Sequence, residues 1–460
     1  MRYFILAFFG ALFLLLIVLW LPGLKYPIVS DTAFYSFLGE SMWKDFRFEL
    51  LGVPYAKHLP FHAFVSYPFV WLFGYSLGMK VSTLIAGYVT LVAAFLLLQE
   101  AISRKVAVLS VSFIAIHHAF VLMMHLGSAD LLFTALFLFS LYGYIKAKND
   151  ARFYLLAFIA AGLSCITRYN GVPLFGLYAV HTLLYRREDI RTFFYAIPAL
   201  LGGGIFCAWL LRNWFVFGDP MHTEYTSELS SHTLGFFHQV YSNTLYYLDP
   251  FHNILPLLFA LSLWGMLRFG RQYAFLLCAM AAAWALTSFW WVQAMRFAFP
   301  GFVLMMGFAI VGGEDLWQRC VSKSTVFVRR ACAIFVIITL CITHLGALCL
   351  YSFGECNAVF DRTVGVIPKD LGLTPEGFYA WHKARVFLRD HAEKIAPLYV
   401  SNPVTSMIWN AEQIAGKSVP IINENKCNSY NITQKPKPTD EVLYTTEESP
   451  HTSLVLQRCQ

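Results

Sequence analysis

The first residue suited to chemistry is a carboxylate that follows an uncharged apolar run. Residues 4–22 contain no charged side chain, and at roughly 20 residues per span such a run can cross a bilayer as a helix. Asp31 follows this run, and Tyr35 comes soon after it. In a partly desolvated, aromatic-rich interface a carboxylate has a raised pKa, which makes it a better base. The alternative interpretation of Asp31 is a helix N-cap, which aspartate supplies well.

A lysine follows in the same segment between the first and second spans. Lys57 lies between Tyr55 and His58, shortly before Pro60. Its ammonium group could bind a phosphate as a point charge, or it could extend to lipid headgroups as lysines at interfaces do. A carboxylate, a tyrosine and a lysine just outside the first span stand where an enzyme would meet a lipid-phosphate substrate.

Three arginines fall on the same side of the predicted membrane as this segment. They are Arg168, Arg212 and Arg296, each next to the end of an apolar run. Arginines at membrane depth usually have a specific role. Together with Lys57 they are candidates for an anion site that holds a lipid-linked phosphate or pyrophosphate, and the alternative is headgroup anchoring.

Other polar residues have weaker signals. Asp130 begins an apolar run after Gly127, and it is either a second carboxylate of the site or an N-cap. His222 and Glu224 have the spacing H-x-E, and with a further histidine, His232 or His238, they could ligate a divalent metal. The spacing matches no recognised metal motif, so the metal is left open and no other cofactor is assigned.

The composition defines the class of protein that must position these residues. Of 460 residues, 58% are hydrophobic and 13% are charged, against about 25% charged in soluble domains. The apolar residues occur in blocks separated by short basic loops, which predicts an all-α, multi-pass membrane protein. The first block is interpreted as a retained helix and not a signal peptide, because many spans follow it. The net charge of +7 comes from these loops, and no basic block interleaved with aromatic residues indicates a nucleic-acid partner.

The pattern predicts about eleven transmembrane helices. Their expected ranges are 4–22, 79–99, 106–124, 130–145, 153–167, 171–185, 192–215, 251–267, 272–289, 298–316 and 331–351. The basic loops alternate with less basic ones, and the positive-inside rule then places the N-terminus in the cytoplasm of an inner or plasma membrane. An odd number of spans places the C-terminus, together with the candidate site residues, outside the cytoplasm.

Two domains are expected. Residues 1–351 form the transmembrane domain, with an interfacial loop at 23–78 and a long polar outer loop at 216–250. Within the first loop, residues 31–75 are amphipathic and aromatic-rich, which favours helices that lie in the interface plane and contact membrane lipids. Residues 352–460 are richer in polar residues and are expected to form a small extracytoplasmic domain or tail, α/β or irregular.

The ordered set of motifs resembles the GT-C superfamily of membrane glycosyltransferases. The likeness is to the branch that contains protein mannosyltransferases and the lipid A aminoarabinose transferase, and it covers about residues 1–315. It rests on SDTAFY at 30–35, YAKHLP at 55–60, LFGYSLGMK at 72–80, GSAD at 127–130, GLSCITRYNG at 162–171, RNWFVFGDP at 212–220 and RFAFP at 296–300. Residues 352–460 resemble no family.

The resemblance implies specific roles. Asp31 matches the catalytic carboxylate of the first outer loop and would be the base toward an acceptor hydroxyl, or would orient an acceptor that is already a phosphate. Lys57 matches the lysine that contacts the donor phosphate, Tyr35 and Tyr55 would border that phosphate, and Arg296 would add a contact. Cations then stabilise the charge on the departing lipid phosphate.

The implied function is transfer of a sugar from a polyprenyl-phosphate donor to a lipid, glycan or protein acceptor at the extracytoplasmic face, with inversion. The alternative is a transporter or flippase of a lipid-linked saccharide that uses the same cationic groove without chemistry. The sequence departs from the family in two motifs. In the first, Thr32 follows Asp31 where the family often has a glutamate. In the second, His58 stands where the family has proline, and Ala56 replaces an acidic residue that some members use for metal.

Overall fold

A computed structural model gives the fold. It describes residues 2–25, 30–50, 52–225, 235–248, 256–288, 290, 295–321, 325–328, 330–331, 333–334, 429–433, 440–445 and 453–457. Among these residues, four helices are long and apolar enough to cross a bilayer: Tyr3–Leu24, Tyr75–Ala101, Phe193–Phe217 and Met295–Arg319. The protein is therefore an integral membrane protein, while the number of eleven spans remains a prediction.

The segment after the first span contains two helices, as expected. α1 (Arg2–Trp20) and the 3₁₀ turn η1 (Leu21–Lys25) lead to α2 (Ser30–Lys44) and α3 (Pro60–Phe73), with the hairpin β1 (Glu49–Leu50) and β2 (Val53–Pro54) between them. Proline in the first turn of α3 suits a helix start, because the N–H that it lacks would have no partner there. α2 carries Asp31 in its first turn, and Lys57 and His58 directly precede α3.

The predicted span 106–124 is broken in the structure. α5 (Arg104–Ala115) and α6 (His118–Leu126) meet at an angle of 59°. His117 is the N-cap of α6, and its side chain accepts a hydrogen bond from the backbone N–H of Ala119. A side chain at the N-cap satisfies an N–H group that has no partner within the helix, so the bond marks a new helix start. The apolar run is therefore two helices, which would together make a fifth span.

The junction between α6 and α7 (Asp130–Lys146) is fixed by side chains from earlier helices. Gly127 ends α6 with a φ of 71°, a left-handed conformation that glycine adopts without strain. Buried hydroxyl and imidazole groups of α2, α3 and α4 (Tyr75–Ala101) donate to backbone carbonyls around it. The pairs are Thr32 with Leu126, His62 with Gly127, Thr83 with Met124, and Thr90 with Leu131.

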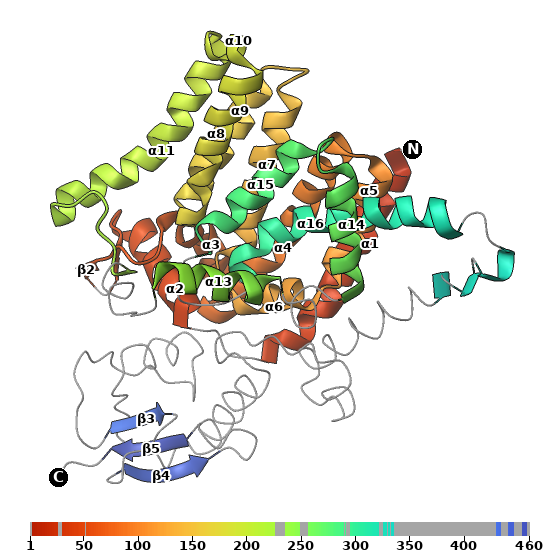
Figure 1. The fold of residues 1–460 in the computed structure, drawn as a ribbon. Coiled ribbons are helices and arrows are strands. Elements are labelled where there is room, and N and C mark those ends of the chain that lie inside the picture. Colours follow the sequence, from red (N-terminus) through yellow and green to blue (C-terminus); the bar gives the residue numbers. More distant parts are fainter. Residues whose placement is uncertain are drawn as a thin grey trace.

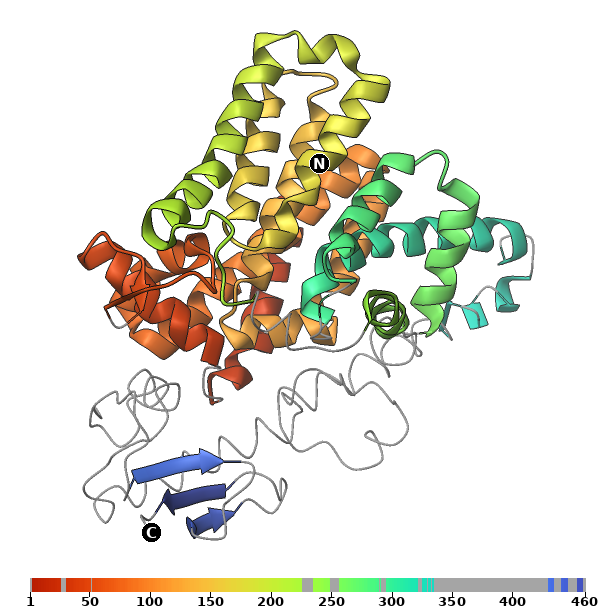
Figure 2. The same cartoon turned by 60° about the vertical axis from the view of Figure 1, so that its left-hand side comes forward.

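A second group of helices extends away from α2 and α3 (Figures 1 and 2). α8 (Phe153–Cys165) leads through the turn η2 (Tyr169–Gly171) to α9 (Pro173–Tyr185), and the short α10 (Arg187–Ile190) leads to α11 (Phe193–Phe217). α8 and α11 touch at two glycines. A Cβ atom on Gly162 would lie 2.3 Å from the carbonyl oxygen of Gly202, so a larger residue there would separate the two helices.

The expected outer loop 216–250 contains a helix, α13 (Phe236–Tyr247). Its inward side is polar: buried Asn243 donates through Nδ2 to the carbonyls of Thr287 at 3.0 Å, Ser288 at 2.8 Å and Trp290 at 2.6 Å. Gln239 donates to the same Trp290 carbonyl at 3.0 Å. α13 therefore holds the chain that follows α15 (Ala274–Ala285).

The remaining described elements complete the bundle and part of the tail. α14 (Pro256–Phe269), α15 and α16 (Met295–Leu316) fall on three predicted spans, and η3 (Trp317–Val321) follows. The predicted span 331–351 lies almost entirely outside the described residues. Of the predicted C-terminal domain, the described residues form an antiparallel sheet in the order β3-β5-β4, with β3 at Ser429–Thr433, β4 at Asp440–Thr445 and β5 at Ser453–Gln457.

Candidate active site

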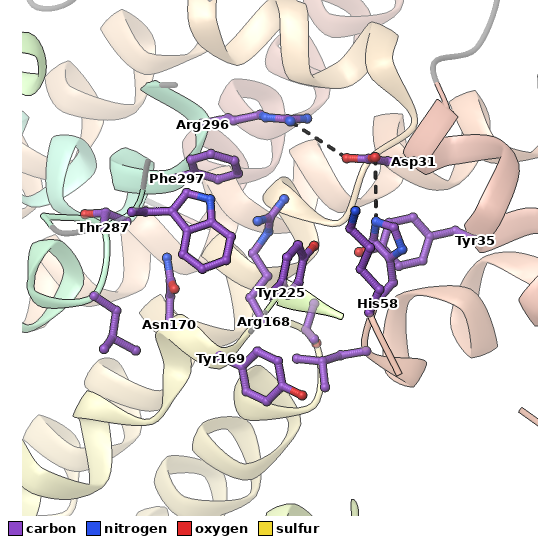
Figure 3. Close-up of a pocket in the computed structure, with 15 residues that line it drawn as sticks. Asp31, Tyr35, His58, Arg168, Tyr169, Asn170, Tyr225, Thr287, Arg296 and Phe297 are labelled. Carbon is purple, nitrogen blue, oxygen red and sulfur yellow. Dashed lines mark ion pairs between the residues drawn. The ribbon is translucent and has the colours of Figure 1, made fainter. Parts of the chain in front are cut away.

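Polar side chains from distant parts of the chain line one cavity of about 240 Å³ (Figure 3). They come from the first turn of α2, the segment before α3, the segment between α8 and α9, the segments after α11 and α15, and the first turn of α16. The lining residues are Asp31, Tyr35, Lys57, His58, Leu59, Thr167, Arg168, Tyr169, Asn170, Tyr225, Leu286, Thr287, Trp290, Arg296 and Phe297.

Asp31 lies between a histidine and an arginine (Figure 3). His58 Nε2 is 3.6 Å from Asp31 Oδ1, and an Arg296 guanidinium nitrogen is 3.8 Å from Asp31 Oδ2. Both distances exceed a hydrogen bond, and about 35% of the Asp31 side chain is exposed. The carboxylate is therefore held by charge but remains accessible from the cavity.

The expected rise in the pKa of Asp31 is wrong. Burial alone would raise the pKa of this carboxyl, but interaction with His58 and the charges of Arg296 and Arg168 outweigh burial and hold it well below its usual range. The physical cause is that an opposite charge nearby favours the ionised form. Asp31 is therefore a carboxylate at neutral and mildly acidic pH.

Asp130 lies beside the cavity and is fully buried. One Arg168 guanidinium nitrogen is 2.6 Å from its Oδ1, and the Ser128 hydroxyl donates to its Oδ2 at 2.5 Å. Arg296 is 3.8 Å from the same Oδ2. Ala129, and not Asp130, occupies the N-cap position of α7. Asp130 therefore pairs with both arginines from a buried position that is not part of the cavity lining.

Three cationic side chains, those of Lys57, Arg168 and Arg296, line the cavity together with the carboxylate of Asp31. Asp130 pairs with the two arginines. Each arginine also lies 4.9 Å from the centre of the Phe297 ring, a cation–π contact that adds to their placement. An anion that entered this cavity would meet all three cationic side chains.

The two predicted tyrosines occupy different positions. Tyr35 lines the cavity, whereas Tyr55 lies behind it and its hydroxyl is 2.6 Å from His58 Nδ1. Burial raises the pKa of both phenols above the usual value, because a buried phenolate is poorly solvated. Both hydroxyls therefore stay neutral.

Arg212, one of the predicted arginines, does not line the cavity. Its guanidinium donates to the carbonyls of Tyr55 and Phe48, both at 3.0 Å, and it also contacts the rings of Phe48, Trp209 and Phe217. Arg212 thus ties the segment that carries Lys57 and His58 to α11. These contacts explain the position of Arg212 without a bound anion.

The weak metal candidates His222 and Glu224 are not among the residues that line the cavity. The His222 ring stacks on Phe217 at 4.2 Å, and Glu224 is exposed. Within the described ranges no three histidine, cysteine, aspartate or glutamate side chains gather closely enough to hold a metal ion. His232, a further candidate, lies outside the described residues, and His238 is exposed on α13.

Several lining residues were not predicted from the sequence. His58 is part of the motif YAKHLP, but it was assigned no role in the site from the sequence. Tyr225 and Thr287 were not identified as candidates. Lys57 Nζ lies 5.4 Å from the centre of the Tyr225 ring. The one available signal was the position of His58 next to Lys57 and close to Tyr55, since a titratable ring beside a predicted phosphate ligand is a candidate for proton transfer.

Solved structures define the class of fold. No family model matches the chain, and no curated protein matches it in sequence. The *apo* oligosaccharyltransferase of Archaeoglobus fulgidus matches at a TM-score of 0.53 and 12% identity, over 95% of this chain and 63% of that chain. The protein therefore has the fold of the GT-C membrane glycosyltransferases, as its motifs predict.

One solved enzyme matches over nearly the whole length of both chains. ArnT from Cupriavidus metallidurans, bound to undecaprenyl phosphate, has a TM-score of 0.60 and 14% identity, with coverage of 98% of this chain and 97% of that chain. The *apo* state of the same protein gives a TM-score of 0.57. At this identity the likeness concerns the fold.

Proposed function

We propose that the protein transfers a sugar from a polyprenyl-phosphate donor to an acceptor, with inversion at the anomeric carbon. The observation that carries this proposal is the convergence of Asp31 with Lys57, Arg168 and Arg296 on one cavity. The ArnT-like fold supports it, since that structure holds undecaprenyl phosphate. The acceptor is a lipid, a glycan or a protein side chain.

The cations would stabilise the leaving group. As the bond between the anomeric carbon and the phosphate oxygen breaks, negative charge grows on the lipid phosphate. Lys57 and Arg296 lie where a phosphate in the cavity would meet them, and Arg168 lies on the same wall. Fixed charges that face developing charge are the most effective form of stabilisation in enzymes. Tyr35 would add a neutral hydroxyl donor.

Asp31 would act on the acceptor. A single displacement with inversion needs the acceptor oxygen on the face of the sugar opposite the phosphate, and a carboxylate can orient that oxygen by accepting its hydrogen bond. The site is placed outside the cytoplasm, with the N-terminus inside, by the distribution of basic loops.

The test is a comparison of membrane lipids and surface glycans in cells that carry the intact protein, a deletion, Asp31→Asn or Asp45→Asn. Asp45 is an exposed carboxylate beyond α2, so it is a matched control. We expect mass spectrometry to find one missing sugar and an accumulated polyprenyl-phosphate sugar in the deletion and in Asp31→Asn, and in neither other strain. A normal glycan profile in Asp31→Asn cells would contradict catalysis and favour a transporter.

A further inference from the structure

His58 is the one imidazole that lines the cavity among the described residues, and both its nitrogens have defined neighbours. Nδ1 is 2.6 Å from the Tyr55 hydroxyl, and Nε2 is 3.6 Å from Asp31 Oδ1. The Tyr55 ring stacks parallel to the imidazole at 5.7 Å, and the Tyr35 ring meets its edge at 5.0 Å. His58 is about 5% exposed. Its ring orientation is therefore fixed, with Nε2 toward the carboxylate.

The 3.6 Å between Nε2 and Oδ1 leaves Nε2 able to accept from another group, because the two atoms do not share a hydrogen bond at that distance. A hydroxyl in the cavity could donate its single proton to Nε2 at an ordinary distance of about 2.6–3.2 Å. A hydroxyl gives up a proton as it becomes a nucleophile, whereas a phosphate nucleophile has none to give. A carboxylate would also repel a phosphate at this position.

We propose that His58 is a catalytic residue that, in place of Asp31, accepts the proton of an acceptor hydroxyl, and that Asp31 acts as the ionic partner of the imidazolium that forms. This inference rests on the proposed glycosyl transfer, and it narrows the acceptor to a hydroxyl compound, as opposed to a phosphate. This sequence has a histidine at position 58, where the family that it resembles has a proline. The proposed histidine base is therefore a property of this chain.

The proposed transfer conserves atoms and charge. Before reaction the His58 proton is on Nδ1 and is donated to the Tyr55 hydroxyl, which leaves the Nε2 lone pair toward the cavity. The acceptor oxygen forms a bond to the anomeric carbon, and the bond from that carbon to the phosphate oxygen breaks with its electron pair on the polyprenyl phosphate. The hydroxyl proton moves to Nε2, and the resulting imidazolium is stabilised by Asp31.

Other charged and titratable groups also face His58. Tyr35 and Asp31 come from α2, Tyr55 from its own segment, Tyr225 from the segment after α11, and His62 from α3. The cations Arg168 and Arg296 line the same cavity. The carboxylate stabilises the imidazolium that forms in the step and the arginines destabilise it, so the step depends on this whole set of groups.

The test uses the purified full-length protein and the polyprenyl-phosphate sugar that accumulates in deletion cells, with release of polyprenyl phosphate as the readout. We expect wild-type kcat to fall at low pH. His58→Gln should lower kcat by about 10²–10⁴-fold, the range for loss of a general base, and should lose this acid limb. His181→Gln, a change outside the cavity, is the control.

A second variant and a binding measurement separate chemistry from folding. Tyr55→Phe removes the Nδ1 partner and should lower kcat by a smaller factor with KM unchanged. Binding of undecaprenyl phosphate should be the same in wild type and His58→Gln. A His58→Gln protein that keeps the wild-type acid limb, or that loses undecaprenyl phosphate binding in step with kcat, overturns the inference. A wild-type protein that releases no polyprenyl phosphate contradicts the proposed function itself.

Discussion

The two aspartates of the site lie in different surroundings. Asp31 is partly exposed to the cavity, and its neighbours His58 and Arg296 lie at 3.6 and 3.8 Å. Asp130 is fully buried, with Arg168 at 2.6 Å and the Ser128 hydroxyl at 2.5 Å. A carboxylate with loose contacts can exchange them for a substrate, whereas one with short buried contacts holds its partners in place. From this difference we propose a chemical role for Asp31 and a positioning role for Asp130.

The largest effect is expected from Asp31→Asn. The amide keeps the shape of the side chain but cannot stabilise the His58 imidazolium, so kcat should fall by about 10²–10⁴-fold. Because the carboxylate is partly exposed and loosely paired, the free energy of unfolding should change by no more than about 1 kcal/mol. Kinetics and thermal melting of the same purified protein measure both. A large loss of stability would show that Asp31 is a structural residue.

Asp130→Ala should show the opposite pattern, with stability as the main loss. Removal of the carboxylate takes away the close partner of buried Arg168 and one of the two carboxylates near Arg296, and breaking a buried pair in this way costs about 3–5 kcal/mol. Chemical denaturation in detergent measures the difference from wild type. A protein of wild-type stability would mean that the two arginines are solvated and that Asp130 does not position them.

The buried surroundings of Asp130 can be tested by the pH dependence of stability, through His62. It donates to the Gly127 carbonyl beside Asp130, and burial lowers its pKa to about 4, so it is neutral when folded. The unfolded state then binds a proton as pH falls below about 6.5, and stability decreases from there down to about pH 4, by about 3 kcal/mol.

The control for this prediction is His62→Gln, which keeps a donor for the carbonyl but does not titrate in this range. Its melting temperature should fall less than that of wild type between pH 7 and pH 5. Asp31 does not confuse the result, because a carboxyl with a lowered pKa loses its contribution only below its unfolded pKa of about 3.9. Equal pH dependence in the two proteins would contradict the assignment.

The smallest effect is expected from Lys57→Met. Loss of one cation among three should weaken undecaprenyl phosphate binding by about tenfold, or about 1.4 kcal/mol, while Lys44→Met should have no effect. Lys44 is exposed on α2 and pairs with Glu40, so it is a matched control. Equal affinities for both variants would mean that Lys57 does not contact the phosphate.

The sequence predicted which charged residues line the cavity better than it predicted their interactions. Asp31, Lys57 and Arg296 could be found because each is a charged side chain at the edge of an apolar run. The pKa of Asp31 was predicted in the wrong direction, since Arg296 lies far away along the chain and only the fold brings it to the carboxylate. Arg212 was grouped with the anion ligands for the same reason: its carbonyl partners cannot be deduced from its neighbours in sequence.

The helices were predicted well where they are long and apolar. They were predicted less well where local hydrogen bonds determine where a helix begins or breaks. α1, α4, α11 and α16 fall on predicted spans. The break at His117 was missed because hydropathy is continuous across it, while the N-cap bond to Ala119 acts locally. α13 was missed because its inward side is polar, with Gln239 and Asn243 bonded to backbone carbonyls.

The starts of three helices at the cavity have a consequence for its electric potential. α2 carries Asp31 in its first turn, α7 begins at Asp130, and α16 carries Arg296 in its first turn. Each helix start contributes a partial charge of roughly +0.5 from its backbone N–H groups. These dipoles do not titrate and are not removed by substitution of a side chain. The cavity therefore keeps part of its attraction for anions at every pH, even in a variant that lacks one of its cationic side chains.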